Sequence, residues 1–136
     1  MIKNNSVQLE LEIKTYDIDM AGHVNNIVYV RWLEDLRTKL ISEICDYKKL
    51  FESGHYLVVI STGIKYKKQL KFGELPIGKM ELLNHSHGII NLKAAIEIND
   101  DISALAEQKC VVMNLTTNKM MPDKMISELF GRGKTE

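Results

Sequence analysis

The sequence predicts an α+β fold in which an antiparallel sheet of about five strands curls around one long helix. The prediction depends on a clean apolar–polar alternation near the start, one long segment of helical periodicity, and several strand-like segments separated by short turns. Short connections favour antiparallel pairing of consecutive strands. Because one helix cannot cover both faces of such a sheet, we expect the sheet to wrap around it and its other apolar positions to meet another copy of the chain.

The first strand and the long helix differ in the period of their apolar residues. Apolar and polar side chains alternate over residues 7–14, as in a strand with one buried face. After a loop over residues 16–26, apolar residues recur every three or four positions as far as Tyr47. We therefore expect a helix from about Asn26 to near Asp46, with Asn25 or Asn26 as its N-cap.

The rest of the chain has the pattern of strands until a short C-terminal helix. The expected strands cover residues 57–67, 76–83, 90–98 and 104–115. His85–Gly88 should form the turn before the third of these strands. Pro122 stands at a plausible first helical position, Gly131 should stop that helix, and the tail 131–136 should fray.

Composition excludes several classes of protein. The chain has 136 residues, with 18 Lys and Arg against 18 Asp and Glu, so a general nucleic-acid-binding role is disfavoured. Cys45 and Cys110 form no CxxC pair, which excludes a zinc ribbon or redox dithiol. Residues 1–12 do not have the pattern of a signal peptide, and no apolar run is long enough for a membrane span. We expect one domain over residues 1–136 and a cytoplasmic location.

The residues suited to chemistry are concentrated in the loop before the long helix. Asp17, Asp19, Gly22 and His23 stand immediately ahead of the expected helix N-terminus. The N–H groups of a first helical turn are unsatisfied and carry the positive end of the helix dipole, so they can hold an oxyanion. A carboxylate within reach of a carbonyl polarised there could act as a nucleophile or as a base on water.

The same loop allows two other interpretations. Asp-x-Asp followed by Gly and two Asn residues is also the composition of an ordinary turn with an N-cap. Alternatively, Asp17, Asp19 and His23 offer two oxygens and one nitrogen to a divalent cation, although no further ligand pair has a suitable spacing. The histidines outside this loop are interpreted as turn or strand-entrance residues: His55, His85 and His87.

A group of lysines surrounds the end of the second expected strand. Lys65, Lys67, Lys68 and Lys71 lie close to Tyr66 in the sequence. The cluster is either a solvated strand end or a landing site for the phosphates of a ligand.

The stretch Asp19-Met20-Ala21-Gly22-His23-Val24-Asn25-Asn26, followed by Tyr29, Trp32, Glu34 and Arg37, resembles the hotdog-fold acyl thioesterases. It is most similar to the 4-hydroxybenzoyl-CoA thioesterase group, which includes small bacterial acyl-CoA hydrolases of the YbgC type. The resemblance covers nearly the whole chain. It implies a hotdog fold, homodimers that often associate into homotetramers, and active sites at the subunit interface.

The resemblance also implies roles for individual residues. Asp19 falls on the family's catalytic aspartate, either nucleophile or general base, and the backbone N–H of Asn26 falls where the thioester carbonyl is polarised. Asp17 is expected to close the loop. His23 is a further candidate for catalysis or for lining the pocket. The candidate substrate-binding residues are Gly22, Val24, Asn25, Lys67, Lys68 and Lys71, the lysines facing coenzyme A phosphates.

Two departures from the related plant acyl-carrier-protein thioesterases favour a mechanism centred on Asp19. Ala21 replaces an asparagine of those enzymes, and Gln69 replaces a glutamate. The expected function is hydrolysis of an acyl-CoA thioester to a carboxylic acid and a thiol, with no metal or organic cofactor. The alternatives are an acyl-carrier-protein substrate, a non-catalytic acyl-thioester-binding module, or a hotdog dehydratase that pairs His23 with Glu34.

Overall fold

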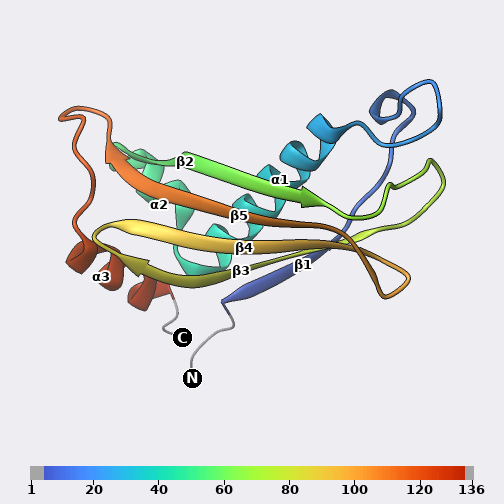
Figure 1. Cartoon of the computed structure of the whole chain (residues 1–136). Helices are drawn as coiled ribbons and strands as arrows, with labels where there is room; N and C mark the ends of the chain where they lie inside the picture. Colours follow the sequence, from blue (N-terminus) through green and yellow to red (C-terminus); the bar gives the residue numbers. More distant parts are fainter. Residues whose placement is uncertain (1–4, 134–136) are drawn as a thin grey trace.

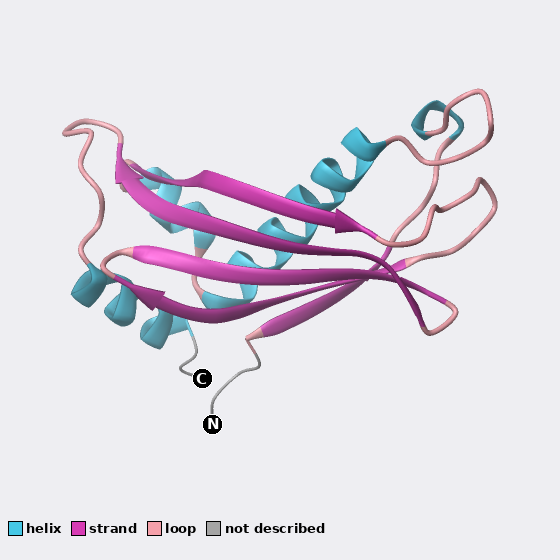
Figure 2. Cartoon of the chain, viewed as in Figure 1, coloured by secondary structure: helices cyan, strands magenta, loops and turns pink. Residues whose placement is uncertain are grey.

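A five-stranded antiparallel sheet curves around the long helix α1 (Asn26–Ile44) in the computed structural model, which describes residues 5–133 (Figure 1). The strand order across the sheet is β1-β3-β4-β5-β2. The strands are β1 (Ser6–Glu10), β2 (His55–Tyr66), β3 (Ile77–Ser86), β4 (Ile89–Ile98) and β5 (Asp101–Asn114). Every pairing is antiparallel, as expected, and Figure 2 shows α1 crossing one face of the sheet. The predicted hotdog architecture is confirmed.

The core lies between α1 and the inward side chains of the central strands. Leu36 and Leu40 of α1 are fully buried, and alternate residues of β4 such as Leu92 and Ile96 belong to the same buried cluster. The helix approaches β3 most tightly at Gly78, where an added Cβ would lie 3.0 Å from the Cδ1 atoms of both Leu11 and Leu36. A side chain at this position would push the helix away from the sheet, so the glycine allows close packing.

The end of the long helix differs from the prediction. α1 stops at Ile44, and a separate short helix, α2 (Tyr47–Glu52), follows it. Cys45 has an extended backbone, and the carboxylate of Asp46 accepts a hydrogen bond of 3.1 Å from the N–H of Lys49, capping α2. Apolar spacing continues through the break, so periodicity did not reveal this change of direction.

The first strand is shorter than its alternation suggested. β1 ends at Glu10 because the N–H of Leu11 bonds to the carbonyl of Pro76 outside the strand ladder, at 2.9 Å. Leu11 and Ile13 are nevertheless buried. The alternation therefore predicted correctly which side chains face the core, although it did not locate the end of the ladder.

The turn and the C-terminal helix also shift by a few residues. β3 continues through Ser86, and the turn consists of His87 and Gly88, both with positive φ (54° and 79°). α3 (Asp123–Gly133) begins one residue after Pro122 and continues past Gly131 instead of stopping there. Residues 134–136 of the tail that was expected to fray lie outside the described residues.

A polar contact attaches α3 to the β3–β4 turn. Oδ1 of Asp123 lies 2.8 Å from Nδ1 of His85 and accepts a hydrogen bond of 3.0 Å from the N–H of Gly88. The His85 ring packs edge-on against Phe130, with 5.9 Å between ring centres. These interactions fix both the start and the inner face of α3. The hydrogen bond with His85, followed by that from Gly88, lowers the pKa of Asp123 from its ordinary value of 3.8.

None of the helices within residues 5–133 combines the length and apolar character needed to cross a membrane.

Replacing Asp123 by Ala should lower the melting temperature at pH 7 by a few degrees, because α3 loses its contact with His85 and Gly88. A lowered carboxyl pKa means that the stabilisation is complete above pH 3.8 and disappears as the pH falls through the folded-state value. The difference in melting temperature between wild type and Asp123→Ala should therefore become smaller below pH 3.8, as measured by calorimetric scans. An Asp35→Ala variant on the exposed side of α1 is the control. A melting-temperature difference between wild type and Asp123→Ala that widens in acid would contradict the proposed role of the Asp123 carboxylate.

Candidate active site

Asp17 holds together the two ends of the loop that precedes α1. This residue ends the 3-10 turn Thr15–Asp17 and is buried. Its Oδ2 accepts a hydrogen bond of 2.8 Å from the N–H of Lys14, and its carbonyl accepts one of 2.9 Å from the N–H of Asn25. The expectation that Asp17 closes the loop is confirmed.

Asp19 is held by the backbone of its own loop. Its Oδ1 accepts hydrogen bonds from the N–H groups of Ala21 (2.9 Å) and His23 (3.1 Å). The Asp19 N–H donates to the carbonyl of His23 at 2.9 Å, and Gly22 completes the reversal with a φ of +80°. Oδ2 of Asp19 has no hydrogen-bond partner within the described part of the chain. The loop thus anchors one carboxylate oxygen and leaves the other open to solvent.

A distant segment, residues 67–76 between β2 and β3, clamps this loop from the other side. The N–H of Val24 donates to the carbonyl of Leu70 at 2.8 Å, and the N–H of Phe72 donates to the carbonyl of Gly22 at 3.0 Å. Leu70 is fully buried. The two segments are therefore fixed in register, and Gln69 is carried to the same cavity as Asp19.

The N-terminus of α1 lacks the usual side-chain cap. Asn25 is the N-cap, but its side chain makes no capping hydrogen bond, and the first turn contains no acidic residue. Among residues 5–133, no acceptor takes the N–H of Asn26. Tyr66 donates its hydroxyl to the carbonyl of Asn26 at 3.3 Å and so ties the end of β2 to the helix start. The positive end of the helix dipole is left available to an anion.

Two neighbouring cavities surround this helix start. The first, of about 470 Å³, is lined by Asp19, His23, Val24, Asn25, Asn26, Ile27 and Gln69. The second, of about 320 Å³, is lined by Val24, Asn26, Tyr29, Tyr66, Lys67, Lys68 and Gln69. The structure therefore brings together the three candidate catalytic residues Asp19, His23 and Asn26, with Val24 and Asn25. Gly22 and Lys71 shape the loop but do not line these cavities.

The lysines of the expected basic cluster differ in their surroundings. Lys68 forms an ion pair of 2.9 Å with Asp101, whereas Lys67 has no ion-pair partner in the part of the chain described. The backbone N–H of Lys71 donates to Oε1 of Glu74 at 2.7 Å. Lys67 and Lys68 line the second cavity, so they are the lysines available to a ligand there.

Two residues of the site were missed by sequence reasoning as lining residues. Tyr66 and Gln69 line the cavity shared with Asn26, although they lie 40 or more positions away along the chain. Gln69 had been considered only as a departure from plant enzymes. The pairing of Val24 with Leu70 brings this segment in, and no local pattern signals such a pairing.

The turn interpretation of the loop agrees with the hydrogen bonds that Asp19 accepts from Ala21 and His23, which leave its second oxygen open. Glu34, the suggested dehydratase partner of His23, forms an ion pair with Arg37, whose Nη1 donates to Gln108 at 3.0 Å. No group of three or more His, Cys, Asp or Glu side chains within residues 5–133 is placed to hold a metal ion.

Comparison with known proteins identifies the family. A family model described as the Thioesterase-like superfamily matches residues 13–129. The chain belongs to this superfamily. Membership makes it a thioester hydrolase, and the hotdog sheet and helix described above agree with it.

Individual known proteins are similar to this chain over most of their length. Long-chain acyl-CoA thioesterase FadM of Escherichia coli is 23% identical over 117 residues, which cover 85% of this chain and 89% of FadM. The structure of a DHNA-CoA thioesterase from Staphylococcus aureus matches with a TM-score of 0.80 at 18% identity, covering 96% of this chain and 97% of that one. Protein SAV2348 of Staphylococcus aureus, solved in complex with CoA, matches with a TM-score of 0.78 at 12% identity, covering 100% and 89%.

Gly22 should be sensitive to substitution because of its backbone angle and not because of crowding. An added Cβ would meet nothing within 4 Å, but φ is +80°. We expect Gly22→Ala to lower the free energy of unfolding by about 1 kcal/mol, and Gly22→Asn by less, because asparagine tolerates the left-handed region. Urea titration measures the free energy of unfolding of both variants. Gly131→Ala, in an open position of α3, is the control and should be neutral or stabilising.

Proposed function

We propose that this thioesterase hydrolyses acyl-CoA to a free carboxylic acid and coenzyme A. The observation that carries the proposal is the meeting of a carboxylate, Asp19, with the uncapped N-terminus of α1 at one cavity. The relationship to FadM supports an acyl-CoA substrate, and so does the CoA complex of the similar SAV2348 structure. An acyl-carrier-protein thioester is the second substrate to test.

In the proposed reaction, the thioester carbonyl oxygen accepts a hydrogen bond from the N–H of Asn26. The helix dipole stabilises the negative charge that develops on this oxygen when the carbonyl carbon is attacked. Asp19 either attacks that carbon through its open Oδ2 or removes a proton from the attacking water. Collapse of the tetrahedral intermediate breaks the C–S bond and releases the thiolate, which is protonated to the thiol. Direct attack by Asp19 leaves an acyl–aspartyl anhydride that water then hydrolyses.

Neighbouring groups have supporting roles in the proposal. His23, held by its backbone to Asp19, borders the acyl thioester, and Lys67 meets phosphates of coenzyme A. Because the oxyanion donor and the base are protein groups, no metal or organic cofactor is required. The buried, unpaired thiols of Cys45 and Cys110 suit a reducing compartment, so we place the enzyme in the cytoplasm.

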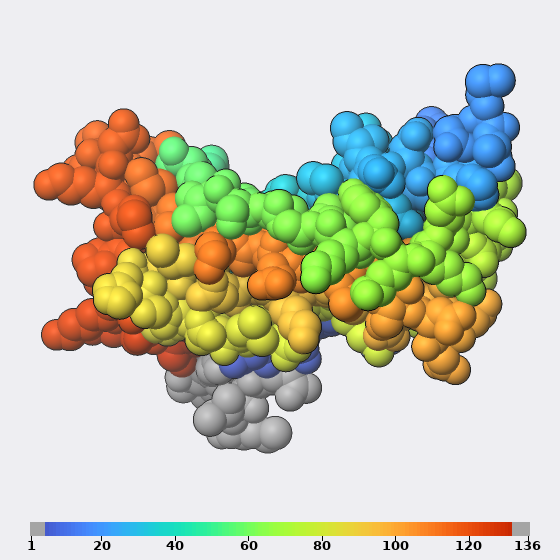
Figure 3. All heavy atoms as spheres, in the orientation of Figure 1, coloured from blue at the N-terminus to red at the C-terminus, as the bar shows by residue number. Residues whose placement is uncertain are grey.

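We further propose that the enzyme works as a homodimer joined along β2. This strand of 12 residues pairs with β5 on one side and is unpaired on the other, and atoms of its green segment lie on the surface in Figure 3. Exposed apolar side chains lie on β2 (Ile60) and on the first turns of α1 (Ile27 and Val30), where Tyr66 bonds the helix start to the end of β2. An unpaired strand edge of this length offers its backbone groups to another strand, and a second copy of the chain can supply an identical edge. The strand at the opposite edge, β1, has only 5 residues. Its Gln8 carbonyl accepts a hydrogen bond of 3.3 Å from Nζ of Lys39.

Replacing Asp19 by Asn tests its chemical role without dismantling the loop, because the amide oxygen can still accept from Ala21 and His23. Turnover should fall by about two to four orders of magnitude, measured as free-thiol release from a panel of acyl-CoAs. Asp100→Asn, in the exposed β4–β5 turn, is the matched control and should retain wild-type turnover. Near-wild-type activity in Asp19→Asn would exclude the assignment, and tight acyl-CoA binding by wild type without thiol release would indicate a binding module.

The substitution Ile60→Lys should separate the subunits, because it would bury a charge in the proposed interface. The dimer dissociation constant should rise at least about tenfold in sedimentation equilibrium, with a parallel loss of hydrolysis at low protein concentration. The control is Leu83→Lys at an exposed position of β3, which should leave assembly unchanged. Unaltered assembly of Ile60→Lys would rule out this edge as the interface.

A further inference from the structure

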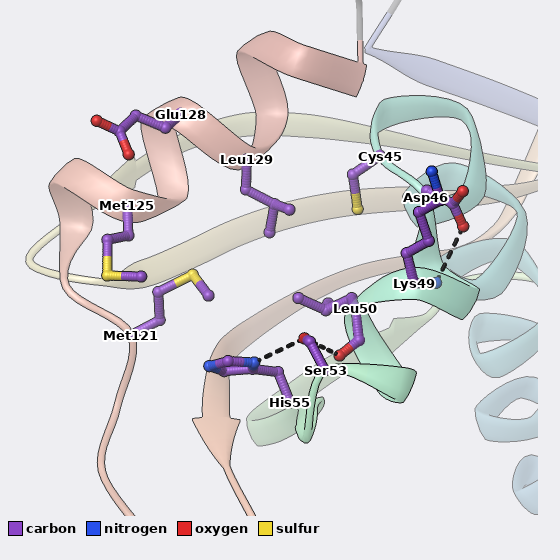
Figure 4. A pocket seen from close by; sticks show the side chains of 10 residues that line it. All are labelled: Cys45, Asp46, Lys49, Leu50, Ser53, His55, Met121, Met125, Glu128 and Leu129. Carbon is purple, nitrogen blue, oxygen red and sulfur yellow. Dashed lines mark hydrogen bonds between the residues drawn. The ribbon is translucent and has the colours of Figure 1, made fainter.

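A separate cavity lies at the opposite end of β2, between α2 and α3 (Figure 4). It measures about 430 Å³ and plays no part in the reaction derived above. Its lining residues are Cys45, Asp46, Lys49, Leu50, Ser53, His55, Met121, Met125, Glu128 and Leu129. Figure 4 shows Met121 and Met125 side by side on one wall, with Leu129 pointing toward Cys45 across the space.

The interior of this α2–α3 cavity is apolar. Leu50, Met121 and Cys45 are buried beneath it, and burial raises the pKa of the Cys45 thiol to about 11, so the sulfur is neutral at physiological pH. Methionine side chains are flexible and polarisable and adapt to chains of different shape. The volume lies within the range of ligand-binding cavities in proteins.

The polar groups at the rim favour a hydrocarbon over a charged ligand. Lys49 is accompanied by two acids, Asp46 and Glu128, so the rim carries no excess of positive charge for a carboxylate or phosphate. The hydroxyl of Ser53 is already bonded to the carbonyl of Leu50 at 2.7 Å and lies 3.0 Å from Nδ1 of His55. What the cavity offers is apolar contact area, which an aliphatic chain can use.

Strand β2 connects this cavity to the reaction site. Its first residue, His55, lines the α2–α3 cavity, and its last, Tyr66, bonds to Asn26. The two ends of a 12-residue strand lie about 36 Å apart, which is too far for a common fatty acyl chain to span within one protomer. A two-fold dimer joined along β2 runs the paired strands antiparallel, so the His55 end of one protomer comes beside the Tyr66 end of its partner.

We propose that the α2–α3 cavity receives the distal end of a long aliphatic acyl chain whose thioester is bound at the Asp19–Asn26 site of the partner protomer. This inference rests on the proposed function and names its substrate class: straight-chain fatty acyl thioesters. Each protomer then supplies the chemistry for one substrate and the tail pocket for another. Chains too short to cross the interface do not reach the cavity.

The test is a series of acyl-CoAs, from butyryl-CoA through octanoyl-CoA to palmitoyl-CoA, with Met125→Trp as the cavity-filling variant. For wild type, kcat/KM should rise about fourfold for each methylene that enters the cavity. In Met125→Trp, kcat/KM for palmitoyl-CoA should fall at least about tenfold while that for butyryl-CoA is unchanged. Ser127→Trp, on the same helix but outside the cavity, is the matched control and should keep the wild-type profile.

The outcomes separate this inference from the function on which it rests. A Met125→Trp profile identical to wild type, or an equal loss for butyryl-CoA and palmitoyl-CoA in a folded dimer, would overturn the tail pocket and leave acyl-CoA hydrolysis standing. If the tryptophan variant fails to fold, Met125→Ala replaces it. Its smaller side chain should then increase the preference for palmitoyl-CoA over octanoyl-CoA, and an unchanged ratio would overturn the proposal. Absence of hydrolysis by wild type with every acyl-CoA would overturn both.

Discussion

The close packing of α1 into the curved sheet is the constraint on which the rest of the structure depends. Leu36 is completely buried, and the helix comes so near β3 that Gly78 cannot carry a side chain without displacing it. A helix held this tightly has its two ends fixed in space. The first end presents unsatisfied N–H groups to the Asp19 loop, and the second turns into α2 and forms one wall of the α2–α3 cavity.

The proposed reaction site is shaped by backbone hydrogen bonds more than by side-chain contacts. Asp17 closes the loop, Asp19 is oriented by two N–H groups, and the carbonyl of Leu70 holds Val24 in register. This arrangement leaves one oxygen of Asp19 open. The overall charge of the chain is zero, yet the Asp19 carboxylate and the positive end of the α1 dipole lie at one cavity, which is the basis of the proposed reaction.

Sequence reasoning predicted the fold well and placed Asp19, His23 and Asn26 at one cavity, because both depend on local patterns. Periodicity identified α1 and the buried faces of the strands, and the Asp19–Asn26 motif indicated the loop, the N-cap region and the family. It did not detect α2, since the apolar spacing runs through Cys45 and Asp46 while the backbone changes direction. It also ended the last helix at Gly131, although the helix continues to Gly133.

The sequence by itself determined that a carboxylate stands a few residues before the N-terminus of the one long helix, inside an antiparallel sheet. Neighbours along the chain specify this arrangement, because a cap, a tight turn and an apolar period are all short-range features. Only the tertiary structure decided that Gln69 and Tyr66 border the proposed site and that α2 and α3 enclose a separate cavity. Those groupings depend on pairings between segments far apart in sequence, whose geometry is set by how the helix and sheet pack together.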